Sequence, residues 1–170
     1  MPALFKIYNG ATPTTAAMAP VTTGTVIKTM LQYKPSATAV SRIVEWGVSF
    51  DGSAAATPGK VELIETDVAA TVTAFVAADI VKINGDAIAY GDVTTNIIQV
   101  GTAASGFTAT AEGTTTASRL LDYQLIAPIT QFIYQSPLDF EAICQVSKFY
   151  RIRVTFGTAI NCVCYMKIAV

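Results

Sequence analysis

The stretch from Ser41 to Thr66, SRIVEWGVSFDGSAAATPGKVELIET, constrains the fold more than any other part of the chain. Every second residue of its first half is large and apolar: Val44, Trp46, Val48 and Phe50. Its second half alternates Val61 and Leu63 with charged residues, and a period of two is expected of a strand with one buried face. Small residues and turn formers lie between the halves. We therefore predict a hairpin of two strands around the only tryptophan.

The last third of the chain repeats this alternation. One segment places Tyr150, Ile152, Val154 and Phe156 on a single face, and the next does so with Cys162, Cys164, Met166 and Ile168. Residues also alternate from Ser118 to Ile126. There Arg119, Leu121, Tyr123 and Leu125 are together more apolar than the residues that alternate with them. Counted over the chain, the pattern predicts eight to ten strands in an all-β fold, an antiparallel β-sandwich of jelly-roll type. The core anchors that we expect are Trp46, Phe50, Val61, Tyr150, Ile152 and Val154.

The first 22 residues differ in amino-acid composition from the rest of the chain. A short strand at Leu4 to Tyr8 precedes a segment rich in Pro, Thr and Ala, which is predicted to run as an extended arm, with a single sandwich domain over residues 23–170. The arm could lie along a neighbouring subunit or fold over its own domain. Two segments supply the candidate subunit or partner contacts, namely the arm with Thr12, Pro13 and Pro20 and the loop with Asp51, Gly52 and Pro58.

Charge is scarce in this sequence. Only 14% of the 170 residues are charged and the net charge is −1, so much of the surface must be neutral and suited to packing against neighbours. Scattered Lys and Arg residues give no basic footprint, so we expect no direct nucleic-acid partner. No apolar run approaches bilayer length, and MPALFKIYNG shows neither the basic start nor the long apolar stretch of a signal peptide, so we expect synthesis in a cytoplasm and no membrane partner. Three cysteines give no disulfide framework, and buried free thiols are expected.

The sequence contains no histidine, which excludes Ser-His-Asp triads, Cys-His dyads and His-containing zinc sites. Phosphate-binding glycine motifs are also missing. A pair of carboxylates remains possible, as in glycosidases, and the candidates are Glu45, Asp51, Glu62, Glu65 and Asp67. Glu45 and Glu62 alternate with core positions, so solvated strand-face carboxylates are the simpler interpretation. We expect no catalytic residues, no cofactor and no metal.

Several blocks of this sequence resemble small structural proteins of tailed bacteriophages. They are KIYNGATPTTAAMAPVTTGTVIKTMLQ, RIVEWGVSFDGSAAATPGKVELIETDVAATVTA, GFTATAEGTTTASRLLDYQLIAP and FYRIRVTFGTAINCVCYMKI, and they are similar to head decoration, or cement, proteins. The resemblance covers most of the chain and rests on general texture rather than on a catalytic signature.

That resemblance implies a function in the virion. It implies a β-sandwich that binds the outer surface of the capsid through the major capsid protein, commonly as a homotrimer, and stabilises the shell by bridging capsomers. A tail, fibre or receptor-binding component would have the same composition and is the alternative. Neither role requires an active site.

Overall fold

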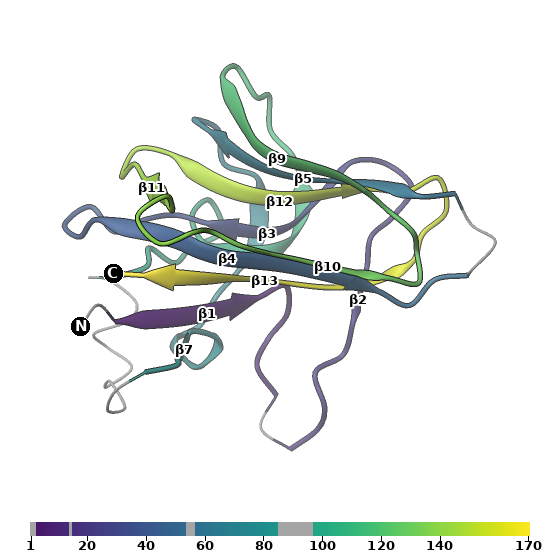
Figure 1. The fold of residues 1–170 in the computed structure, drawn as a ribbon, viewed down its shortest axis with the longest axis horizontal. Helices are drawn as coiled ribbons and strands as arrows, with labels where there is room; N and C mark the ends of the chain where they lie inside the picture. The colour runs from purple at the N-terminus through teal and green to yellow at the C-terminus, as the bar shows by residue number, and fades with distance from the viewer. Residues whose placement is uncertain (1–2, 14, 54–56, 85–96) are drawn as a thin grey trace.

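The protein is a sandwich of two antiparallel β-sheets (Figure 1). The computed structural model describes residues 3–13, 15–53, 57–84 and 97–170. Within these ranges the only helical element is one turn of 3₁₀ helix, η1, at Ala77–Asp79. The two sheets face each other and enclose one main apolar core, so the prediction of an all-β sandwich is confirmed.

The sheets contain seven and six strands. In order across the first sheet lie β10 (Gln131–Gln135), β4 (Ser41–Phe50), β13 (Asn161–Ala169), β1 (Leu4–Tyr8) and β7 (Val81–Lys82), with β11 (Ala142–Cys144) also on β4 and β2 (Val21–Thr22) also on β13. The second contains β6 (Thr71–Ala74), β8 (Gly106–Ala111), β3 (Lys28–Tyr33), β12 (Phe149–Thr155), β5 (Gly59–Thr66) and β9 (Ser118–Ile126). The described residues thus form more strands than the eight to ten predicted, because β2, β7 and β11 are too short to show alternation.

Strands β4 and β5 are both formed as predicted, but they are not a hairpin. β4 pairs with β13 and β10 in one sheet, whereas β5 pairs with β12 and β9 in the other. The connection between them therefore crosses from sheet to sheet, and its residues 54–56 lie outside the described ranges. Period-two alternation gives each strand a buried face but says nothing about its pairing partner. The hairpin prediction is wrong for this reason.

A β-bulge changes the buried face of β4. Trp46 pairs with Met166 and Glu45 with Lys167, but the next pair joins Ile43 to Ile168, so Val44 has no partner on β13. The extra residue shifts the alternation by one position. Ile43 is consequently buried and Val44 only half-buried, which corrects the prediction that Val44 belongs to the core face.

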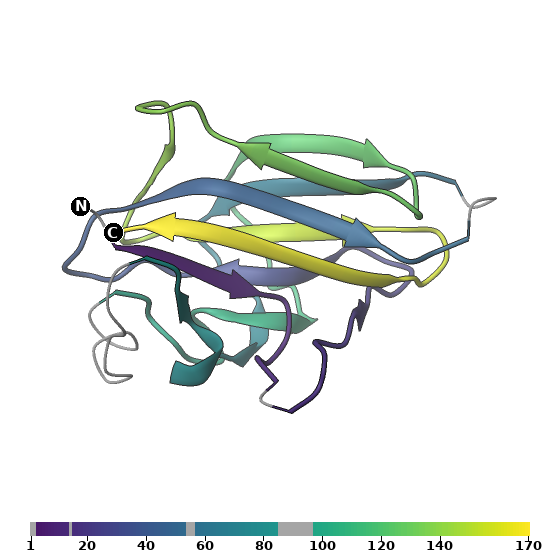
Figure 2. The same cartoon turned by 60° about the horizontal axis from the view of Figure 1, so that its bottom comes forward.

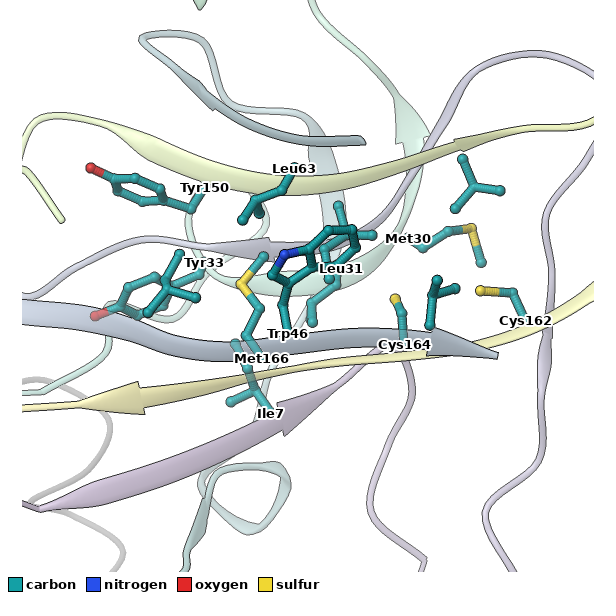
Figure 3. Packing of buried hydrophobic residues seen from close by; sticks show 14 of the residues in the cluster. Ile7, Met30, Leu31, Tyr33, Trp46, Leu63, Tyr150, Cys162, Cys164 and Met166 are labelled. Carbon is teal, nitrogen blue, oxygen red and sulfur yellow. The ribbon is translucent and has the colours of Figure 1, made fainter. Parts of the chain in front are cut away.

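All six expected core anchors lie in one buried cluster between the sheets. Figure 3 shows Trp46 at its centre with Leu31, Leu63 and Met166 close by. The three cysteines are buried and free, as predicted. Packing is tight at Gly59, where an added Cβ would stand 2.3 Å from the ring of Phe156. Glycine is needed here for space.

The N-terminal residues are part of the sandwich. β1 pairs with β13 and β7, and β2 returns to pair with β13, so both ends of the intervening segment are held in the same sheet. Figure 1 shows this segment as the long loop below β2. Its backbone is anchored by a hydrogen bond of 2.7 Å from Thr12 N to Asp79 Oδ1. The expected boundary at residue 22 thus falls at the end of β2 in the first sheet.

Candidate functional site

The two lateral sides of the sandwich are closed differently. On one side the segment β6–η1–β7 links the sheets, and Phe75 and Ile80 from it are buried. On the other side β9 is the last strand of one sheet and β10 the last strand of the other. The turn at residues 127–130 joins these two edge strands at one end only. In Figure 2 this side is the green segment along the top, where β9, β10 and β11 lie.

Large apolar side chains are exposed along this side, which we call the β9–β11 edge. Ten of the sixteen exposed large apolar side chains in the described residues belong to it: Leu120, Tyr123, Leu125, Ile129, Ile133, Tyr134, Leu138, Phe140, Ile143 and Val146. Leu138 and Phe140, in the loop between β10 and β11, are 81% and 82% exposed. Exposed apolar side chains concentrated in one region indicate a surface that binds another macromolecule.

The alternation within β9 explains part of this exposure. Val61 and Leu63 of β5 face the core and pair with Gln124 and Asp122 of β9, so the more polar set of β9 points inward. Tyr123 and Leu125 therefore point outward and are exposed. This part of β9 therefore places apolar side chains towards solvent, whereas Leu121, beyond a register shift in the pairing, packs against the core. Outward apolar side chains of this kind are suited to an interface in an assembly.

A cavity of about 510 Å³ opens between the two edge strands. Its lining comes from β9, the β10–β11 region and the core strands β4 and β5: Ile43, Trp46, Leu63, Arg119, Leu121, Asp122, Tyr134, Ser136, Phe140, Glu141, Ala142, Ile143 and Gln145. We call it the edge pocket. It exists because the sheets are linked at only one end of this side, so the core reaches the surface.

One wall of the edge pocket is fixed by a hydrogen-bonded group. Tyr150 donates to Glu65 Oε2 at 2.7 Å, Arg119 Nη2 donates to the same oxygen at 2.7 Å, and Gln145 N donates to the Tyr150 hydroxyl at 2.8 Å. Burial, followed by the bond to Glu65, raises the pKa of Tyr150 above its ordinary value. Burial likewise raises the pKa of nearby Cys144 to about 12, so this thiol stays protonated and unreactive near neutral pH.

Each of the five carboxylates named as catalytic candidates has a hydrogen-bond or ion-pair partner within the chain. Glu45 binds Lys167 and Tyr165, Glu62 pairs with Arg153, and Glu65 binds Arg119 and Tyr150. Asp67 accepts hydrogen bonds from Thr116 and Ala117, and Asp51 accepts one from Asn161. Each carboxylate stabilises a local structural contact. Asp122 and Glu141, which the sequence analysis did not select, are the two acids that line the edge pocket.

None of the predicted contact residues is among the exposed apolar side chains of the β9–β11 edge, although Gly52 contacts the turn between β9 and β10. Pro13 and Pro20 are exposed in the segment before β2. Asp51 and Pro58 are also exposed, whereas Gly52 is half-buried and donates a 2.6 Å hydrogen bond from its N to Pro128 O. The sequence signal for the β9–β11 edge was the apolar set in β9, which we interpreted only as strand alternation.

The described ranges contain neither a metal-binding cluster of side chains nor a membrane-spanning helix. No group of three or more His, Cys, Asp or Glu side chains there is placed to hold a metal ion. In the same part of the chain no helix is both long and apolar enough to span a bilayer.

Comparisons with known proteins add no assignment. No family model, no curated protein and no solved structure matches this chain.

Proposed function

We propose that this protein is a structural component of a bacteriophage virion. In this role it binds the outer surface of the capsid, through the major capsid protein, and stabilises the shell by bridging neighbouring capsomers. The β9–β11 edge is the observation on which the proposal depends, because it concentrates exposed apolar side chains on one side of a domain with few charges. The resemblance of the sequence to head decoration proteins supplies the class of partner.

The physical basis of the proposed function is burial of apolar area. Removing apolar surface from water contributes roughly 25 cal/mol per Å². Leu125, Leu138 and Phe140 are each more than 60% exposed in the isolated chain, so their burial against another subunit favours association. A homotrimer would present this edge three times, and simultaneous contacts with adjacent capsomers would raise the free energy of local shell opening beyond that of one contact.

A shell-binding assay tests the proposal. Purified protein is mixed with expanded capsids that lack it, and the bound fraction and the temperature of shell opening are measured. We expect saturable binding and a higher opening temperature. Leu125→Asp and Leu138→Asp should each weaken binding by at least about tenfold, because each places a charge in an apolar contact. Val26→Asp is the matched control, since Val26 is 71% exposed outside the β9–β11 edge.

Circular dichroism and thermal unfolding of the free variants establish that the substitutions leave the fold intact. Absence of binding by folded wild-type protein, together with unchanged shell stability, would contradict the proposal. Binding to tails or fibres in place of shells would establish the alternative, a tail structural component. Equal loss of binding in the Val26 variant would show that the β9–β11 edge is not the contact.

A further inference from the structure

The indole of Trp46 reaches the edge pocket and has no hydrogen-bond partner for its N–H. Trp46 is 1% exposed, lines the pocket, and its Nε1 is unpaired among the residues that the structure describes. In Figure 3 the indole nitrogen lies on the side of the ring that faces Leu63 and Tyr150, away from Cys164. A buried donor that lacks an acceptor costs free energy, so this group is poised to gain an acceptor from outside the chain.

The remaining walls of the pocket restrict the chemistry of the occupant. Leu63, Leu121, Tyr134 and Ile143 form an apolar lining, which favours a ring or a branched chain. Arg119 is already paired with Glu65 and Glu141 with Arg42, while Asp122 contributes negative charge. An anionic ligand such as a fatty acid is therefore disfavoured. A neutral group with an apolar body and an oxygen at its tip fits this lining.

The surroundings of the pocket indicate that this group arrives on a polypeptide. Tyr134, Phe140 and Ile143 line the pocket and are also exposed members of the β9–β11 edge. β9 and β10 are both terminal strands, so each has a backbone edge that no other described strand pairs with. Free strand edges and exposed apolar side chains at the mouth are features of a protein-binding surface.

We propose that the edge pocket receives a tyrosine side chain from a neighbouring polypeptide. The ring packs between the apolar walls, and the phenol oxygen accepts a hydrogen bond from Trp46 Nε1, replacing any water that satisfies the N–H in the free protein. The phenol O–H donates a hydrogen bond to a carboxylate oxygen of Asp122 or Glu141, which line the pocket. This inference does not depend on the proposed function, because it concerns the pocket and requires no capsid.

The test uses two small probes that differ by one hydroxyl group. N-acetyl-tyrosine amide has the acceptor oxygen, and N-acetyl-phenylalanine amide is the matched ligand without it. Because Trp46 is the only tryptophan, it gives a single indole N–H cross-peak in a ¹⁵N-labelled sample of the full chain. We expect the tyrosine probe to shift this peak saturably with a dissociation constant of about 1 to 10 mM. The phenylalanine probe lacks both hydrogen bonds of the phenol and should bind at least about fivefold more weakly.

Three variants locate the binding and identify the donor. Ile143→Asp places a charge at the mouth and should weaken the tyrosine probe by at least about tenfold. Leu125→Asp lies on β9 outside the pocket lining and should leave probe binding within about twofold of wild type. Trp46→Phe, measured by ligand-observed NMR, should lower the preference for the tyrosine probe by about fivefold, because it removes the indole donor and leaves the carboxylates in place. Circular dichroism is recorded for each variant, and Trp46→Leu, which also lacks a donor, replaces Trp46→Phe should the latter fail to fold.

Each negative result in these experiments overturns a different part of the proposal. No shift of the indole peak with either probe up to about 20 mM overturns the proposal, as does equal affinity of the two probes. An Ile143→Asp variant that binds as wild type overturns the location. Because Leu125→Asp is expected to weaken shell binding and to spare probe binding, failure of this inference and failure of the proposed function are distinguishable.

Discussion

The hydroxyl of Tyr33 on β3 donates a hydrogen bond of 2.7 Å to Oγ of Ser41 on β4. Both residues are fully buried and their strands belong to different sheets, so a polar contact joins the two halves of the sandwich inside an apolar core. Burial raises the pKa of Tyr33, and the group remains a neutral donor throughout the ordinary pH range.

We predict that either single removal of this contact destabilises the fold, and that the double removal does not add to the loss. Tyr33→Phe and Ser41→Ala should each lower the free energy of unfolding by about 1 to 2 kcal/mol, because each leaves one buried polar atom unpaired. The double variant should be no less stable than the worse single variant. Urea unfolding at pH 7 measures all three, and strictly additive losses would show that the two groups are not coupled.

A second buried polar contact involves charged groups, in contrast to the neutral contact between Tyr33 and Ser41. The Arg151 side chain is fully buried, pairs with Glu112 and donates to Thr29 Oγ1 at 2.7 Å. Burial lowers the pKa of Arg151 and the charge of Glu112 opposes that shift. Glu112→Gln should cost about 2 kcal/mol, less than the roughly 3 to 5 kcal/mol of a fully buried pair because Glu112 is 25% exposed.

The matched control for Glu112→Gln is Arg42→Gln. The Arg42–Glu141 ion pair is 3.6 Å long, with Arg42 46% and Glu141 9% exposed, so its loss should cost about 1 kcal/mol, less than the loss of the partner of the fully buried Arg151. Equal losses in the two variants, measured by denaturant unfolding, would contradict a special role for the buried arginine.

Glu45 should make stability depend on pH at the acid end. Burial alone would raise the pKa of Glu45, but hydrogen bonds from Lys167 at 2.7 Å and Tyr165 at 2.5 Å bring it below its ordinary value. A lowered folded-state pKa gives stability that is fully present above the unfolded pKa of about 4.3 and is lost as the pH falls through the folded value. The stability difference between wild type and Glu45→Gln should therefore shrink steadily below about pH 4.3. A difference that stays constant from pH 7 to pH 2 would refute this assignment.

Gly59 is expected to tolerate no side chain while Phe156 is present. An added Cβ would overlap the Phe156 ring, so Gly59→Ala should lower the free energy of unfolding by about 1 to 3 kcal/mol. Phe156→Leu removes part of the ring, and the double variant should recover part of the loss caused by Gly59→Ala in that background. A thermodynamic cycle from thermal or urea unfolding measures the coupling, and a value near zero would show that the two sites are independent.

Sequence patterns identified strands well where alternation was uninterrupted. β12 and β13 bury the predicted faces, with Tyr150, Ile152, Cys164 and Met166 among the fully buried residues. In β4 the same reasoning failed beyond Trp46, because a bulge adds one residue and exchanges Val44 for Ile43. A bulge depends on the neighbouring strand, so the residues of β4 alone do not predict it.

The candidate site was harder to predict because it depends on tertiary arrangement. Leu125 and Tyr123 form an apolar set that normally indicates a core face, yet the pairing of β9 with β5 turns them outward. The edge pocket joins Trp46 of β4 to Asp122 of β9, which are far apart in the chain. Only the position of β9 and β10 at the ends of their sheets brings these residues to one opening.

The location of the chain in an intact particle tests the proposed function most directly. Cryo-electron microscopy of purified virions at a resolution that identifies β-sandwich domains measures it. Our account predicts density for this domain on the outer surface of the capsid, with the β9–β11 edge against a neighbouring subunit. Density confined to the tail, or particles that lack the chain altogether, would contradict it.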